Sequence, residues 1–177
     1  MNASSAQLYV FVSGHMACIK IVGRANFTSS IDFKMLVTEL GEKGFTCYVL
    51  DLSECMLMDS TFLGVLAGLA LKMQETHTGN GHDQVIELLN ANARNLESLE
   101  SVGVLHLFRV LTGADRLPAE LALHATVPTA KPSREEVTRN CLEAHKTLME
   151  ICPSNIPKFK EVTQFLAEDL KKLKPQG

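Results

Sequence analysis

Short hydrophobic runs alternate with longer segments of helical periodicity through the first part of the chain. Residues 8–12 and 17–22 are β-prone runs separated by Ser13-Gly14-His15, a pattern that favours a hairpin. Residues 29–42 then carry apolar side chains at helical spacing. The nearly continuous apolar run over residues 47–52 is typical of a central strand that is covered on both faces. The pattern predicts a hairpin, a helix and a buried strand, in that order.

The alternation continues as far as residue 112. It predicts a helix over residues 60–76, a second buried strand over 85–89, a short helix over 93–102 and an edge strand over 107–111. This order of strands and helices after an opening hairpin implies an α/β fold, in which helices pack on a mixed sheet of four to five strands.

A helical hairpin is predicted for the end of the chain. Apolar side chains recur every three or four residues within 134–151 and within 158–173, and each range therefore predicts an amphipathic helix. Residues 153–157 begin and end with proline, which stops one helix and starts the next. We expect the apolar stripe of this hairpin to be buried either on the preceding part of the chain or on a second copy, as in a homodimer.

The distribution of charge divides the chain into two parts. Residues 131–177 carry nine basic and seven acidic side chains, whereas residues 1–130 carry eight basic and thirteen acidic ones. Prolines flank this change in composition and indicate a boundary. We therefore expect one domain over residues 8–112, a linker over 113–132 and a helical extension over 133–174.

Composition excludes several classes of function. The chain has 17 basic and 20 acidic residues and a net charge of −3, which argues against a basic surface for nucleic acid. The most apolar stretch, residues 62–71, is far shorter than the about 20 residues that span a membrane. Lys20 is the one basic residue among the first twenty, so no signal peptide is visible. We expect a soluble, cytoplasmic protein without a membrane span.

The chain shows no recognisable catalytic or metal-binding motif. Its five cysteines are odd in number, lie among apolar neighbours and include no Cys-x-x-Cys pair, which favours buried thiols. Its six histidines lack the spacing of metal ligands. His145 lies on a predicted polar helix face, which favours a solvated side chain over a phosphorelay histidine. The sequence predicts a non-enzymatic protein that has no catalytic residues, metal site or cofactor.

Polar residues gather where the central strand leads into the second helix. Asp51-Leu52-Ser53 ends the predicted strand, and Asp59-Ser60-Thr61 opens a helix that is apolar on nearly every side. Helix capping accounts for these residue types, because their side-chain oxygens accept hydrogen bonds from free backbone N–H groups. Three such residues stand together, however, where one cap would suffice.

At these residues the chain resembles the STAS domains, the sulfate transporter and anti-sigma factor antagonist domains. Their signature is a hydrophobic strand ending in Asp-Leu-Ser, then a loop, then Asp-Ser-(Ser/Thr)-Gly-Leu-Gly at the start of the next helix. Asp51-Leu52-Ser53 and Asp59-Ser60-Thr61-Phe62-Leu63-Gly64 match this signature in content and spacing. The resemblance covers about residues 8–112, implies a STAS-like fold for them and leaves the predicted hairpin outside.

The resemblance implies a phosphorylation switch. In the antagonist branch of the family, the serine after the motif's aspartate is phosphorylated by an ATP-using serine kinase that is also an anti-sigma factor. That serine is Ser60 here, with Thr61 as a second choice and Asp59 as the adjacent carboxylate. The unphosphorylated form binds the kinase and releases the sigma factor. Arg24 and Asn26 follow the second strand, in a loop that faces the same edge in STAS folds, and are partner-binding candidates, although solvation explains them as easily.

Phe62 departs from the family pattern, which usually has glycine at that position. Its side chain either packs inward as part of the helix core or projects across the surface that a kinase must reach. We include Phe62 with Asp59 among the predicted partner-binding residues. If Phe62 blocks Ser60, the chain is instead a constitutive STAS scaffold subunit of a larger signalling or transport assembly.

Overall fold

The chain opens with an antiparallel hairpin of β1 (Gln7–Ser13) and β2 (Met16–Ala25), in which Val10 pairs with Ile19. Gly14 makes the turn at a φ of +58°, a backbone conformation that glycine adopts without steric cost. Both strands are longer than predicted, and the end of β2 beyond residue 22 pairs with a further strand.

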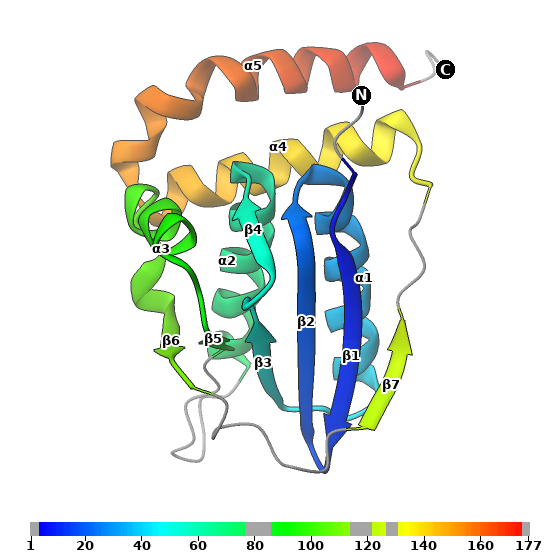
Figure 1. Ribbon diagram of the computed structural model, residues 1–177. Helices are drawn as coiled ribbons and strands as arrows, with labels where there is room; N and C mark the ends of the chain where they lie inside the picture. Colours follow the sequence, from blue (N-terminus) through cyan, green and yellow to red (C-terminus); the bar gives the residue numbers. More distant parts are fainter. Residues whose placement is uncertain (1–3, 77–85, 114–121, 127–130, 175–177) are drawn as a thin grey trace.

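The protein is described by a computed structural model, shown in Figure 1. The structure describes residues 4–76, 86–113, 122–126 (backbone alone) and 131–174.

Parallel strands continue the sheet on one side of β2, in the order β6-β5-β3-β2-β1-β7. The strands β3 (Cys47–Asp51), β5 (Ile86–Leu89) and β6 (Phe108–Leu111) run parallel to β2. At the other edge, β7 (Ala122–Thr126) pairs antiparallel with β1. The short β4 (Cys55–Met58) pairs in parallel with the end of β2, beyond its pairing with β3. The predicted position of residues 47–52 inside the sheet is confirmed.

Two strands lie where the sequence pattern gave no strand. Cys55 and Met58 in β4 are buried at the two ends of the strand, and a run of four residues is too short for a period to be read. The strand β7 lies within residues 113–132, which we expected to be a linker. Most of that range is outside the described residues, and the division of the chain at residues 112 and 133 stays a prediction.

Two long helices cover one face of the sheet, as Figure 1 shows. They are α1 (Phe27–Glu42) and α2 (Ser60–Glu75), and both begin at the end where the parallel strands finish. Phe33 of α1 and Phe62 of α2 are fully buried, with ring centroids 5.1 Å apart. A shorter helix, α3 (Ala93–Ser101), and the 3-10 turn η1 (Leu105–Leu107) connect β5 to β6.

The helical hairpin predicted for the end of the chain is present. It consists of α4 (Arg134–Ile151) and α5 (Ile156–Leu173), joined by the 3-10 turn η3 (Pro153–Asn155). In Figure 1, α4 crosses the sheet end at which α1 and α2 begin, and α5 runs back along its outer side. Leu148 of α4 is 0% exposed within the core, so α4 buries its apolar stripe on the same chain.

In the parts of the chain that the structure describes, no helix is long and apolar enough to cross a membrane.

Candidate functional site

Asp59 joins the beginnings of α1 and α2. It is the N-cap of α2, where one carboxylate oxygen accepts a hydrogen bond of 2.8 Å from the backbone N–H of Phe62. The other oxygen accepts from the backbone N–H of Phe27 in α1, also at 2.8 Å. Burial raises the pKa of Asp59, whereas these two N–H donors and the nearby His145 act in the opposite direction. Asp59 therefore holds two helix N-termini at a fixed separation.

Ser60 is the first residue of α2, and its side chain contacts α4. The Ser60 Oγ lies 2.9 Å from Nε2 of His145. The other imidazole nitrogen of His145, Nδ1, lies 2.7 Å from the backbone carbonyl of Cys141. Because a carbonyl only accepts, Nδ1 carries a proton, and in the neutral ring Nε2 accepts the Ser60 hydroxyl hydrogen. The Ser60 hydroxyl is thus half-buried and oriented by α4.

Over the next residues of the first turn, from Thr61 to Gly64, α2 and α4 approach each other closely. Thr61 is 5% exposed and its hydroxyl donates to the sulfur of Cys141 at 3.6 Å. A Cβ atom at Gly64 would lie 2.4 Å from the backbone carbonyl oxygen of Ala144, so only glycine fits there. The glycine at the end of the Asp59–Gly64 motif therefore admits α4 to this position.

Phe62 packs inward. Its side chain is 0% exposed and lies against Phe33 in the core. This position corrects the prediction of Phe62 as a partner-contacting residue, because a fully buried ring offers no atoms to a partner. The inward alternative is the correct one: the opening turn of α2 faces the sheet at this position, where an aromatic side chain fills the space between α1 and α2.

Arg24 and Asn26 lie at the same end of the sheet but differ in their contacts. Arg24 is exposed and belongs to β2 itself rather than to the loop after it. The side chain of Asn26 is the N-cap of α1 and accepts from the backbone N–H groups of Thr28 and Ser29, both at 3.1 Å. Asn26 therefore has a structural role, and Arg24 remains available at the surface.

His145 is the site residue that sequence reasoning missed. It is 6% exposed, so the prediction of a solvated side chain is wrong. His145 follows Cys141 by one helical turn and therefore shares its face of α4, which is the face turned towards α2. That spacing was the available signal, but a polar residue at the margin of an apolar stripe is usually solvated.

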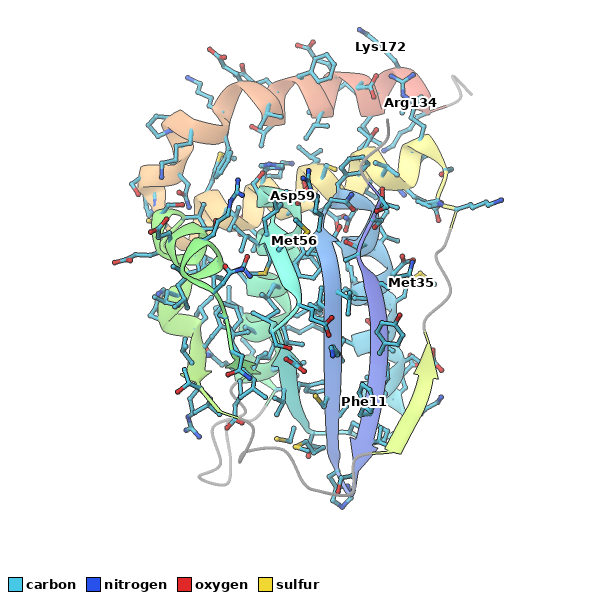
Figure 2. The ribbon with its side chains drawn as sticks, in the orientation of Figure 1. Phe11, Met35, Met56, Asp59, Arg134 and Lys172 are labelled. Atoms are coloured by element: carbon cyan, nitrogen blue, oxygen red, sulfur yellow. The ribbon has the colours of Figure 1, made fainter. Side chains whose placement is uncertain are left out.

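Two exposed apolar side chains lie close to Asp59. Phe27, whose N–H binds Asp59, is 45% exposed, and Met56 of β4 is 55% exposed. Figure 2 shows Met56 next to Asp59, with α4 above both. Together with Arg24, which pairs with Leu57 across β2 and β4, they form an exposed rim around Asp59. Their exposure depends on tertiary packing, and the sequence pattern carried no signal for it.

The chemistry of the site is that of an oriented hydroxyl at a helix N-terminus. Free N–H groups at such an end favour negative charge, and Nε2 of His145 accepts the hydrogen of the Ser60 hydroxyl. Among the described residues, no group of three or more His, Cys, Asp or Glu side chains could hold a metal ion.

Comparisons with known proteins identify the fold. No protein-family model matches the chain, and no curated protein matches it. Among solved structures, the anti-sigma factor antagonist SpoIIAA in its unphosphorylated form matches with a TM-score of 0.50 at 14% sequence identity, covering 61% of this chain and 89% of that one. A proposed anti-sigma factor antagonist from Thermotoga maritima matches with a TM-score of 0.48 at 16% identity, covering 59% and 85%. The chain has the STAS-like fold of the anti-sigma factor antagonist SpoIIAA, as its motif predicted.

Proposed function

We propose that this chain is a cytoplasmic, non-enzymatic regulatory module of the anti-sigma factor antagonist type, switched by phosphorylation of Ser60. The observation that carries the proposal is the position of Ser60 at the start of α2, next to the Asp59 cap, in a fold shared with SpoIIAA. The partner is a serine kinase that is also an anti-sigma factor. It binds the unphosphorylated form and dissociates from the phosphorylated one.

Phosphorylation of Ser60 adds negative charge at a helix start. The folded chain tolerates this charge there, but a protein interface that covers the serine does not. The Ser60 oxygen attacks the γ-phosphorus of ATP, the bond to the β-phosphate oxygen breaks, ADP leaves, and the hydroxyl proton passes to a base of the kinase. The new group carries about −1.5 to −2 charges, which the N-terminus of α2 helps to accommodate. Thr61 is the second acceptor, and its burial makes it the poorer one.

The partner surface in this proposal is the exposed rim around Asp59. Arg24 supplies a positive charge, and Phe27 and Met56 supply apolar area beside the acceptor. Asp59 and Asn26 hold the rim in place through the caps of α2 and α1. A partner that covers this rim would bring its own groups close to Ser60, so a phosphate there would lose its hydration in the interface.

A second candidate function has its own supporting observation. Because α4 contacts Ser60 through His145, a kinase does not have free access to the hydroxyl in this conformation. A constitutive STAS scaffold subunit needs no such access. Its assembly contacts would then include the outer face of α5, where Phe165 is 65% exposed, either to a larger complex or to a second copy of the chain.

The test compares two substitutions at Ser60 with a charge control. The kinase-like partner is purified from the native host, and its affinity for each variant is measured by calorimetry. We expect Ser60→Asp to weaken binding by about a hundredfold, because a charge is desolvated in the interface. Ser60→Ala should keep the partner bound and lose about 0.5–1.5 kcal/mol of stability, since Asp59 supplies the cap and only the bond to His145 is lost.

Ser53→Asp is the matched control, because it adds the same charge to an exposed loop position. It should leave the affinity unchanged. Phosphate transfer from labelled ATP to wild-type protein, located by mass spectrometry, should occur at Ser60. Equal affinities for Ser60→Asp and Ser60→Ala, with no phosphate on the wild type, would reject the switch and leave the scaffold function.

A further inference from the structure

One face of α4 covers the beginnings of α1 and α2, and we call the covered surface the masked face: Ser30 of α1 with Ser60, Thr61 and Gly64 of α2. We propose that the α4–α5 hairpin masks this face, so that a kinase reaches Ser60 only after α4 has moved away from α2. The inference rests on the proposed function, since it concerns how the same serine is regulated.

The contacts at the masked face are polar side-chain contacts together with the packing of buried Ala144 against Gly64. Asn140 donates to Ser30 Oγ at 2.9 Å, and His145 meets Ser60 at the same distance. Glu143 forms an exposed ion pair with Lys34 at 3.4 Å. When such groups separate, each exchanges its protein partner for water, so the net loss per contact is small. The contacts of His145 and Glu143 are therefore ones that water can replace, whereas the bond between Asn140 and Ser30 is buried.

The next turn of α4 is attached differently. Leu148 is 0% exposed and belongs to the main core cluster. Asn155, which follows in the turn, is also 0% exposed, and its amide donates to the carbonyl oxygens of Val102 and Leu148 at 2.8 Å each. Water cannot replace these contacts at equal free energy, because they are apolar or fully buried. The mask can separate at the Ser60 end while it stays attached at the Leu148 end.

The outer helix holds His145 against Ser60. The ring of Phe159 in α5 packs edge-on against the imidazole, with centroids 5.0 Å apart. His145 thus lies between Ser60 on one side and Phe159 on the other. This arrangement gives α5 a role in masking although it makes no contact with Ser60 itself.

Two glycines on α2 provide a matched test. A methyl group at Gly64 would meet the Ala144 backbone at 2.4 Å, so Gly64→Ala forces α4 away from the masked face. One turn on, the added methyl group of Gly68→Ala meets the Thr147 side chain at 3.6 Å, which is ordinary contact, and it leaves α4 in place. Both substitutions change helix propensity equally, so a difference between them reports the fit of α4 alone.

Native cysteines report the movement without any partner. Cys141 of α4 faces Thr61 of α2, and Cys47 is exposed. Cys18 and Cys55 are buried in the sheet, and burial raises the pKa of each thiol to about 11. The full chain is alkylated with iodoacetamide, and each site is followed by peptide mass spectrometry. We expect Cys141 to react about tenfold faster in Gly64→Ala than in the wild type or Gly68→Ala, while Cys18 and Cys55 stay protected.

Either of two results would overturn the mask. Equal Cys141 rates in the two glycine variants would mean that α4 does not separate. A joint rise at Cys141 and Cys55 would mean that α4 leaves only when the whole fold opens. A Ser60→Cys substitution in each background extends the test to the acceptor position, and its sulfur should react in step with Cys141.

A disulfide staple separates this inference from the proposed function. Thr61→Cys places a second sulfur next to native Cys141, and oxidised glutathione closes the pair and fixes α4 on α2. With the kinase-like partner, the oxidised variant should take up no phosphate, and reduction should restore uptake; Thr61→Ser is the control. Equal phosphorylation of the oxidised and reduced forms would reject the mask alone, whereas no phosphate on any form would reject the proposed function.

Discussion

The two helices of the hairpin have the same length and very different contacts. Both α4 and α5 contain 18 residues and both carry an apolar stripe in the sequence. Six residues of α4 are buried: Thr138, Asn140, Leu142, Ala144, His145 and Leu148. In α5 only Thr163 is buried, and Phe165, Ile156 and Val162 are 65%, 45% and 37% exposed. An apolar stripe therefore does not by itself tell how deeply a helix is buried.

The difference arises from what each helix packs against. The inner helix, α4, packs on α2 and α1 with one face and on α5 with the other. The outer helix, α5, packs on α4, with Arg134 bound to Asp169 at 2.8 Å and Lys158 bound to the carbonyl oxygen of Ser101 at 2.6 Å. Removal of α5 uncovers one layer, whereas removal of α4 opens the core.

Truncation gives the largest expected effect. A chain that ends at Ala130 loses Leu142, Ala144 and Leu148 from the core, and we expect it to lose more than about 5 kcal/mol and to aggregate. A chain that ends at Asn155 keeps these residues and should lose roughly 1–3 kcal/mol while still unfolding cooperatively. Urea unfolding and size-exclusion chromatography measure both. Equal midpoints for the two truncations would show that α4 is no more integral than α5.

A pair of leucine substitutions makes the same comparison at single positions. Leu148→Ala empties a fully buried site and should lower the free energy of unfolding by about 2–5 kcal/mol. Leu166→Ala, on the half-buried stripe of α5, should lower it by about 1 kcal/mol or less. Chemical denaturation with an unchanged m-value checks both. The comparison fails if the α5 substitution has the larger effect.

A substitution at Asp59 tests the two helix starts on which α4 packs. Asp59→Ala leaves the N–H groups of Phe62 and Phe27 without their acceptor and should lower the free energy of unfolding by about 1–3 kcal/mol. Because burial raises the pKa of Asp59 in the folded chain, the folded chain holds its proton to a higher pH than the unfolded chain does. The contribution of Asp59 to stability therefore falls as pH rises from its ordinary pKa through its raised one.

The difference between wild type and Asp59→Ala isolates this titration from all other carboxyl groups. It should be larger below that pH window than above it. A difference that grows with rising pH would show that the two backbone donors, rather than burial, dominate the pKa of Asp59.

The outer face of α5 gives the smallest expected effect. Val162 and Phe165 are exposed, so Val162→Gln and Phe165→Gln should change the free energy of unfolding by no more than about 0.5 kcal/mol. Thermal unfolding and elution volume measure the result. A large loss, or a shift in elution volume for one variant alone, would indicate that this face is covered in solution.

The order of elements could be predicted from the sequence because it depends on local periodicity. The buried run at residues 47–52 and the spacing within 134–151 specify a strand and a helix wherever they finally lie. The strand β4 escaped because its pairing depends on the end of β2, which is distant in sequence. The length of β2 was underestimated for the same reason, because its last residues pair with β4.

The site could be predicted only in part. Asp59 and Ser60 were found because cap residues occupy a fixed place relative to a helix start. The contact between Ser60 and His145 joins residues 85 positions apart and depends on how α4 crosses α2, which no local pattern encodes. Phe62 shows the converse case, because its residue type was clear while its direction depended on the packing of Phe33.

The anchoring of the turn at Asn155 makes α4 a lever with its pivot at one end. Measured from Ile151 at a rise of 1.5 Å per residue, His145 lies about 9 Å along the helix and Arg134 about 25 Å. A swing of roughly 20° about that pivot would carry His145 about 3 Å and Arg134 about 9 Å. A small force applied near Arg134, far from Ser60, would therefore suffice to move His145 away from the serine.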